Sequence, residues 1–361
     1  MHARSTTWLH HLLLLVAGPG LYGCAWASIG FRALGYPTTV AGEAANVVVD
    51  GQFAYVSRAE EGFDILDLDS RQAMRPAAPP GSESIDDLAL ADDLLFVLDA
   101  RPPGHLSVYS IADPAAPVLV SGPVEVPVGP FSGVSAAAGR VIVSGGTSEL
   151  TLRTYDPNGQ LGTDVAKADF GRGQPDVLLA GDGNRAIVST HFVGPHFGLT
   201  TVRVSSTPLS VAQAGTMDLD TIGFTAGGAK PANFPIESAL AGDVLLVAYA
   251  RGLALIDVSQ FDQPRLLSEI QLDVQPVSVD VHGATAAVVG SSPRPMLLLV
   301  DIKNPSAPTV TRSIPLPEGS YATGVAIGPT HIVVAAHAEG VLIFPRLDVA
   351  FNESTTTRRK T

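Results

Sequence analysis

One short segment of this 361-residue sequence contains two histidines whose spacing could support chemistry. His191 and His196 stand in "STHFVGPHFG", residues 189–198, beside Phe192 and Phe197. Imidazole nitrogens bind transition metals, but the segment has no carboxylate or thiol to complete a set of three or four ligands. We therefore predict no metal site, and a ligand or partner site and ordinary loop packing are the interpretations that stay open.

A second long segment, "DTIGFTAGGAKPANFP" at residues 220–235, also combines aromatic and polar side chains. Long connections in a compact domain often carry function, because a rigid scaffold can hold binding groups on its loops. Aromatic rings with a few polar groups suit contact with a sugar or a peptide, and they suit packing over a neighbouring strand equally well. The ligand-binding candidates from the two segments are His191, Phe192, His196, Phe197, Lys230, Asn233 and Phe234.

Cys24 is the only cysteine, and it follows the apolar run "LLLLVAGPG". A weakly positive start and a short apolar stretch are typical of an export signal, and the stretch is shorter than the about 20 apolar residues that span a bilayer. "LYGC" resembles the lipobox of bacterial lipoproteins, which predicts lipidation at Cys24. "AWA" also fits ordinary cleavage after Ala27, and an uncleaved cytoplasmic cysteine is a third interpretation. Residues 1–27 are therefore predicted to be a signal segment.

The elements that must position the candidate residues repeat along the chain. Valine occupies the fourth place of seven similar apolar segments, the first "FAYVSR" and the last "HIVVAA". Turn signals such as Asp50-Gly51 precede them, and a second apolar strand and, in several units, a proline turn follow. The spacing is about 44 residues, except where the long segments 189–198 and 220–235 lengthen it. The seven valines are Val56, Val97, Val143, Val188, Val247, Val288 and Val334.

Four short strands in each unit predict an all-β, seven-bladed β-propeller. Near-continuous apolar runs fit the middle strands of a blade, because neighbouring blades cover both of their faces. The last unit lacks a clear fourth strand, so we expect residues 29–40 to complete it and to close the ring. The propeller is predicted to span residues 28–350, with a disordered tail at 351–361. The predicted blades lie near residues 44–83, 84–128, 129–171, 172–221, 236–272, 273–317 and 318–349 plus 29–40.

Polar residues recur ten places before several of these valines, on the strand expected to line the central channel: Asn46, Asp87, Glu237 and Ser278. A carboxyl pair in a narrow channel could perform acid–base catalysis or hold a cation, and a hydrated polar lining is the alternative. Asp87 and Glu237 are the catalytic candidates if the protein is an enzyme. No nucleophile elbow, phosphate-binding loop or zinc motif accompanies them in the sequence.

Four units share an apolar strand, and in three of these a turn that contains proline follows it: "FDILDL", "SVYSI" with "DPAAP", "LALIDV" with "SQFDQP", and "LLLVDI" with "NPSAP". These segments resemble the LVIVD-repeat proteins, which are secreted or lipid-anchored bacterial β-propellers. The third, fourth and seventh units depart from the pattern, with Thr154, Arg203 and Pro345 where aspartate would stand. The resemblance implies a propeller in the cell envelope, and it implies no particular catalytic activity.

The formal net charge of the chain is −13, and the body is more acidic still without its two ends. This charge argues against nucleic acid as a partner, because binding to a phosphate backbone depends on Lys and Arg. Arg58 and Arg101 lie in connections that could attract an anion, but glutamates such as Glu60 lie in the same connections. A mixed, solvated surface is therefore the favoured interpretation.

Together these observations predict a non-enzymatic propeller of the cell envelope that presents a loop-rich face to a protein, peptide or glycan and needs no cofactor. A lipid anchor at Cys24 would be its only membrane contact and would place it at the outer membrane or cell surface; secretion or a periplasmic location is the alternative. The alternative function is a hydrolase or lyase that acts on a polysaccharide through Asp87 and Glu237. A third hypothesis is a scaffold in an envelope assembly.

Overall fold

The valine of each repeated segment lies in the second strand of an antiparallel sheet in the computed structural model. The structure describes residues 44–346 except for 59–61, 75–84, 100, 129–131, 146–148, 170–173, 192–197, 220–234, 250–251 and 338–339. Within these residues the chain forms seven sheets, which we number as blades 1 to 7. Each blade is a simple up-and-down meander, so strands that are consecutive in sequence are neighbours in the sheet.

The strands of the first four blades are as follows. Blade 1 contains β1 (Ala44–Asp50), β2 (Phe53–Arg58), β3 (Gly62–Asp67) and β4 (Gln72–Met74). Blade 2 contains β5 (Asp87–Ala91), β6 (Leu94–Asp99), β7 (His105–Ser110) and β8 (Val118–Glu125). Blade 3 contains β9 (Val134–Ala137), β10 (Arg140–Ser144), β11 (Glu149–Thr154) and β12 (Ala166–Asp169). Blade 4 contains β13 (Gln174–Leu179), β14 (Arg185–His191), β15 (Gly198–Ser206) and β16 (Leu209–Asp218).

The remaining blades continue the same order. Blade 5 contains β17 (Pro235–Ala241), β18 (Val244–Tyr249), β19 (Gly252–Asp257) and β20 (Arg265–Gln271). Blade 6 contains β21 (Gln275–His282), β22 (Thr285–Ser292), β23 (Met296–Asp301) and β24 (Thr309–Pro315). Blade 7 has three strands among the described residues: β25 (Gly324–Ile327), β26 (His331–Ala335) and β27 (Val341–Pro345).

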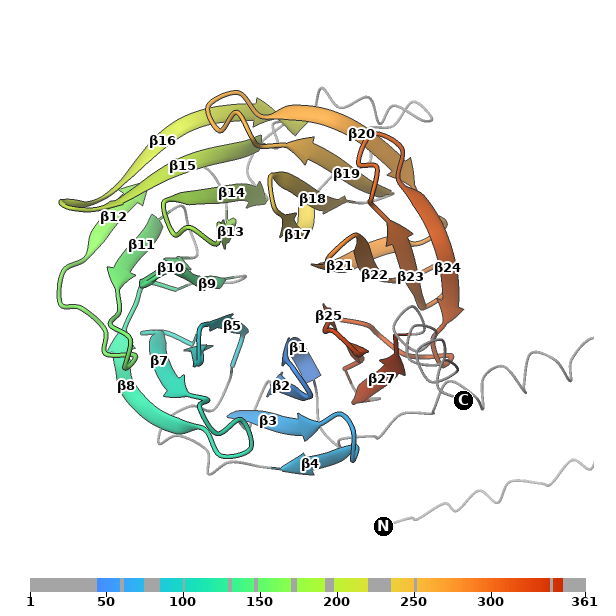
Figure 1. The fold of residues 1–361 in the computed structure, drawn as a ribbon, viewed down its shortest axis with the longest axis horizontal. Helices are drawn as coiled ribbons and strands as arrows, with labels where there is room; N and C mark the ends of the chain where they lie inside the picture. Colours follow the sequence, from blue (N-terminus) through green and yellow to red (C-terminus); the bar gives the residue numbers. More distant parts are fainter. Residues whose placement is uncertain are drawn as a thin grey trace, which may run out of the picture. The chain divides into compact units, whose positions relative to one another are not determined.

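The blades form a ring in which the first strand of each blade lies innermost (Figure 1). The inner strands contact one another in cyclic order, from β1 to β5 and β9 and onward to β25, and β25 contacts β1. The outermost strands, such as β8, β16 and β24, lie at the rim (Figure 1). The prediction of an all-β, seven-bladed propeller is confirmed.

The hydrophobic core consists of seven separate layers in the described residues, one between each pair of neighbouring blades. The layer between blades 7 and 1, for example, packs Val333 and Ile343 against Val56 and Leu66. Both faces of a middle strand therefore lie in core, and all six residues of β6 are buried. This double burial explains the near-continuous apolar runs, because neither face of such a strand contacts water.

Tight turns connect the first and second strands of most blades. Gly51, Gly242 and Gly283 occupy these turns with φ between +56° and +63°, and a Cβ atom at any of them would meet nothing within 4 Å. The backbone conformation, and not a lack of space, therefore favours glycine here. Two-residue turns with positive φ match the twist of antiparallel strands, which explains the turn signals before the valine segments.

The aspartate of the four-unit pattern ends the third strand and begins the next turn. The carboxylates of Asp67, Asp257 and Asp301 each accept the N–H two residues further on, at 3.0, 2.9 and 2.8 Å. Ser110 stands at the same place in blade 2, and its hydroxyl accepts the N–H of Ala112 at 3.5 Å. An aspartate at a strand end stabilises a turn in this way because its short side chain reaches its own backbone.

The two ends of the ring carry different connections. We call one the turn end, because it holds the connections between first and second strands and between third and fourth strands. There Arg185, at the start of β14, pairs with Asp243 in the corresponding turn of blade 5 at 3.1 Å. The loop-rich end holds the second-to-third connections and the crossings between blades. There the ring of Tyr321, between β24 and β25, contacts the ring of His337, after β26, at 6.2 Å.

Several sequence predictions concern residues outside the described part of the chain. They include the signal segment with Cys24, the closing strand at 29–40 and the tail at 351–361. One expectation is corrected: residues 189–198 do not form one long loop, because β14 continues to His191 and only residues 192–197 lie between β14 and β15. Among the described residues, no helix is long and apolar enough to cross a membrane.

Candidate functional site

Each blade contributes one inner-strand position to the channel. This position directly precedes the Cα partner of the blade's valine: Val97 pairs with Leu88, for example, and Asp87 precedes Leu88. The same rule identifies the equivalent position in every blade, because all seven first hairpins pair in the same way. The seven positions are Asn46, Asp87, Gly133, Asp176, Glu237, Ser278 and Gly324.

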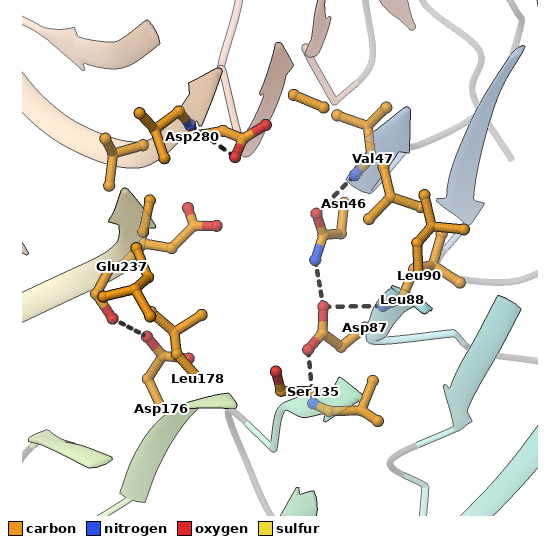
Figure 2. A pocket seen from close by; sticks show the side chains of 18 of the residues that line it. Asn46, Val47, Asp87, Leu88, Leu90, Ser135, Asp176, Leu178, Glu237 and Asp280 are labelled. Carbon is orange, nitrogen blue, oxygen red and sulfur yellow. Dashed lines mark hydrogen bonds between the residues drawn. The ribbon is translucent and has the colours of Figure 1, made fainter. Parts of the chain in front are cut away.

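A cavity of about 450 Å³ occupies the middle of the ring. Four carboxyl groups from four different blades line it, those of Asp87, Asp176, Glu237 and Asp280, together with the amide of Asn46 (Figure 2). No lysine, arginine or histidine lines the cavity in the described part of the chain. The channel is thus a polar cavity whose ionisable groups all carry the same sign of charge.

The structure brings together three of the four channel residues expected from the sequence, namely Asn46, Asp87 and Glu237. Ser278 differs, because it is fully buried and does not line the cavity. Its hydroxyl oxygen accepts the N–H of Val325 in blade 7 at 3.0 Å. The cavity is lined instead by Asp280, two residues further along β21 and therefore on the same side of the strand.

Asp176 and Asp280 are the channel residues that the sequence count misses. Asp176 occupies the same structural position as Asp87, but the hairpin between β13 and β14 is longer than the two-residue turns of the other blades. Counting ten residues back from Val188 therefore reaches Leu178 and not Asp176. The two-residue alternation of a β-strand could have identified both residues, because side chains an even number of places apart lie on the same face of the strand.

Side chains on the inner strands form hydrogen bonds across the blade junctions (Figure 2). The Asn46 amide of blade 1 donates to Asp87 Oδ1 of blade 2. Asp87 Oδ2 accepts the N–H of Val134 in blade 3 at 2.8 Å. The hydroxyl of Ser135 in blade 3 accepts the N–H of Leu179 in blade 4 at 2.9 Å. Three consecutive junctions are thus joined by polar groups.

The remaining junctions are joined in the same manner. The Ser238 hydroxyl of blade 5 donates to Asp176 Oδ2 of blade 4 at 3.0 Å. Ser278 of blade 6 is a hydrogen-bond partner of Glu237 of blade 5. Asp280 Oδ2 of blade 6 accepts the N–H of Ile327 in blade 7 at 2.8 Å.

Between blades 7 and 1, the Thr323 hydroxyl donates to the Ala44 carbonyl at 2.9 Å. Hydrogen bonds that involve side chains therefore cross every junction around the channel. The polar residues of the inner strands first of all hold neighbouring blades together.

The cavity also changes the acidity of its carboxyl groups. Burial raises the pKa of Asp87 to about 7 and that of Asp280 to about 6, against the hydrogen bonds that these carboxylates accept from backbone N–H groups. Burial likewise raises the pKa of Glu237 well above its ordinary value, and Asp176, Asp87 and Asp280 add to this shift through charge repulsion. Desolvation disfavours the charged form of an acid, and nearby carboxylates disfavour it further.

This arrangement limits the chemistry that the channel can perform. A carboxyl group with a pKa near neutrality suits general acid catalysis. However, Asp87 accepts hydrogen bonds at both oxygens, from Asn46, Leu88 and Val134, and is therefore fixed between three blades. Within the described ranges, no group of three His, Cys, Asp or Glu residues is placed to hold a metal ion.

One of the loop candidates, His191, lies at the loop-rich end. His191 is the last residue of β14, and its Cα pairs with that of Gln174. The other six, Phe192, His196, Phe197, Lys230, Asn233 and Phe234, fall outside the described residues.

The structure adds one residue to this end that the sequence analysis did not single out. Tyr321 is 58 % exposed, and its ring lies edge-on to that of His337. An exposed tyrosine in a connection has no period or motif, so no sequence signal marked it.

Two arginines of this end, Arg58 and Arg101, lie beside carboxylates. Arg58 is buried and forms an ion pair with the equally buried Asp64. Arg101 pairs with Asp99 at 3.4 Å. Both guanidinium groups are therefore engaged by carboxylates of their own blades.

Comparison with known proteins adds a family relationship to this geometry. A family model described as "LVIVD repeat" matches residues 41–73 and 295–314. These two segments match the repeat, and the rest of the chain lies outside the match. They cover blade 1 as far as Ala73 and the two outer strands of blade 6 as far as Ile314, and each contains a turn aspartate, Asp67 or Asp301. The aspartate of the LVIVD repeat thus has a structural role in this protein, because it ends a strand and stabilises the turn.

Solved structures support the fold alone. The chain is similar to the β-propeller domain of Cps50 (Swd1) from "Myceliophteria_thermophila", with a TM-score of 0.63 and 12% identity over 86% of this chain and 99% of that one. It is also similar to a chain of a mitotic checkpoint complex, with a TM-score of 0.61 and 12% identity over 93% and 99%. A computationally designed protein, Ika8, has a TM-score of 0.55 and 9% identity over 86% and 98%. A search of curated proteins found no significant match.

Proposed function

We propose that this protein is a non-enzymatic binding or scaffold propeller that presents its loop-rich end to a protein, peptide or glycan of the cell envelope. The LVIVD repeats and the seven-bladed ring fit such a role, because a rigid ring can hold connections from many blades on one surface. Propellers host many unrelated functions, so the site and not the fold must support the proposal.

The observation that carries the proposal is the exposed Tyr321 at this end. Tyrosine is enriched at binding surfaces, because its ring offers a large apolar face and its hydroxyl a polar contact. Its neighbour His337 has a φ of +47°, a conformation that non-glycine residues rarely adopt. Among the described residues, the other large exposed apolar side chains are Val118 and Leu119 on β8, Val310 on β24, and Val165 directly before β12.

The test compares Tyr321→Ala with the parent on a glycan array and in chemical cross-linking to envelope fractions. We expect Tyr321→Ala to reduce binding by about tenfold or more, the size of loss found at a central interface residue. Val118→Ala, equally exposed but on the rim, serves as the matched control and should bind as the parent does. Equal binding by parent and Tyr321→Ala, or a loss confined to Val118→Ala, would contradict the proposal.

The raised pKa values of Asp87 and Glu237 favour one alternative, a hydrolase or lyase that acts on a polysaccharide. In that case Asp87→Asn and Glu237→Gln would abolish turnover of a polysaccharide substrate while the Tyr321→Ala protein stays active. In a binding protein, the two channel variants would keep the partner that the parent binds. If the parent protein cleaves none of the polysaccharides tested, this alternative is ruled out.

Attachment to the envelope through Cys24 is part of the proposal and rests on the "LYGC" sequence. Metabolic labelling with palmitate should mark the parent protein and leave Cys24→Ser unlabelled. Equal labelling of both would show that Cys24 is not the lipidated residue, and a parent protein without label would favour cleavage after Ala27.

A further inference from the structure

The four carboxyl groups of the channel belong to one cavity and to four different blades. Asp87 comes from β5, Asp176 from β13, Glu237 from β17 and Asp280 from β21. The other polar side chains that line the cavity are neutral, those of Asn46, Ser135 and Ser238, and β25 contributes only apolar residues. The described lining residues include no lysine, arginine or histidine.

The same carboxyl groups hold the ring together. Asp87 joins blades 1, 2 and 3, and Asp280 joins blades 6 and 7. A carboxyl oxygen has two acceptor sites, and the Val134 N–H uses one site of Asp87 Oδ2. A proton can therefore bind at the other site while the bond between the blades is kept. Protonation removes charge repulsion from the cavity without removing the contacts between blades.

We propose that the channel carboxyl groups are a proton-binding device that tightens the propeller in mildly acidic solution and loosens it as the solution becomes neutral and alkaline. The device lies in the inner strands, where the four groups repel one another across the cavity and each blade is joined to the next by polar contacts. It acts on the stability of the ring and is independent of what the loop-rich end binds.

The direction follows from the acidity of the channel. An unfolded Asp or Glu has a pKa of about 4, whereas burial raises the pKa of Asp280 to about 6, that of Asp87 to about 7 and that of Glu237 further. Below about pH 4 both states are protonated and the channel imposes no penalty. As the pH rises toward 7, the unfolded chain loses protons first, so the folded state becomes less stable.

Other groups also titrate near this range. Burial lowers the pKa of His331, which makes stability rise with pH, and burial raises the pKa of Glu269, which makes stability fall. Neither residue lines the channel. The turn aspartates Asp67 and Asp257, whose pKa values are lowered, are ionised throughout the range between pH 5 and 8. The test therefore compares channel variants with the parent at each pH.

The decisive variant is Glu237→Gln, which keeps the shape of the side chain and its hydrogen bond to Ser278. We expect the parent to melt at least about 3 °C lower at pH 8 than at pH 5. Glu237→Gln should melt close to the parent at pH 5 and above it at pH 8, because the buried charge is gone. Asp280→Asn should also flatten the dependence, at a lower melting temperature throughout because one N–H loses its acceptor. The matched control is Asp93→Asn, an exposed residue of the turn end, which should follow the parent curve.

Calorimetric unfolding of the parent at pH 6, in two buffers with different heats of ionisation, gives a second measurement that needs no variant. Unfolding should release protons, because the channel groups that are protonated in the ring become ionised in the open chain. Proton uptake, or no exchange, would overturn the proposal. So would a difference in melting temperature between pH 5 and 8 that stays the same in the parent, Glu237→Gln and Asp280→Asn proteins.

Discussion

The aspartates of the channel and those of the turn end do similar work and acquire opposite acidities. Asp87 accepts hydrogen bonds from two backbone N–H groups and an amide, yet burial raises its pKa to about 7. Asp257 accepts from the hydroxyl and N–H of Ser259 and pairs with Arg265, and its pKa is lowered. Both carboxylates satisfy backbone donors. At Asp87 burial outweighs these hydrogen bonds and raises the pKa, whereas at the solvent-accessible Asp257 the hydrogen bonds from Ser259 and Arg265 prevail and lower it.

The difference has a consequence for stability. A turn carboxylate contributes stability only when it is ionised, whereas a channel carboxyl group lowers stability when it ionises. Aspartates in two parts of the same ring thus affect stability in two different pH ranges. Variants of a channel aspartate and of a turn aspartate should show these two pH ranges separately. A third carboxylate, which lies in a buried ion pair, shows how large the effect of an interior charge becomes.

The largest effect is expected at Asp64, which is only 1 % exposed and is paired with Arg58. Arg58→Ala should lower the free energy of unfolding by about 3–5 kcal/mol, because it removes the cation that compensates a buried carboxylate. Chemical denaturation followed by circular dichroism measures the change.

The matched control is Arg265→Ala, which removes the exposed partner of Asp257 and should change the free energy of unfolding by at most about 1 kcal/mol. Similar losses for the two arginine variants would mean that burial does not set the strength of these ion pairs.

A smaller effect is expected at the channel. Asp87→Ala should cost about 2–3 kcal/mol at pH 5, because the Val134 N–H and the Asn46 amide lose their acceptor inside the ring. Asp87→Asn should cost less, since its remaining oxygen can still accept one of these bonds. Thermal unfolding of the three proteins at pH 5 gives the order, and an asparagine variant as unstable as the alanine variant would argue against a bridging role.

The smallest effect is expected at the turn. Asp257→Ala should lower the free energy of unfolding by less than about 1 kcal/mol at pH 7, since water can replace the lost acceptor. The folded pKa of Asp257 is lowered, so its contribution is present above the unfolded pKa of about 4 and is lost as the pH falls through the folded value. Melting curves of parent and variant should therefore converge toward pH 3. If the difference in melting temperature between parent and variant instead grew in acid, Asp257 would affect stability as a channel carboxyl group does.

Much of the architecture can be predicted from residues that obey a local rule. The valines at the fourth place, the glycines with positive φ and the turn aspartates each do the same job in several blades, so their spacing is visible in the sequence. Asp87 and Glu237 could be assigned to the channel for the same reason. Asp176 could not, because a longer hairpin shifts its place in the count while its Cα register stays the same. Ser278 fails differently, since it shares a strand face with Asp280 but is covered by blade 7.

The sequence alone determined the number of blades, the order of their strands and three of the polar side chains that line the channel, Asn46, Asp87 and Glu237. These properties follow from periodicity, which is a local property of the chain. Only the tertiary structure decided that Asp87, Asp176, Glu237 and Asp280 share one cavity with no cationic side chain among its described lining residues. It also decided that hydrogen bonds involving side chains around the channel join each blade to its neighbours. Acidity depends on this arrangement, because desolvation and charge repulsion act between groups that lie far apart in sequence.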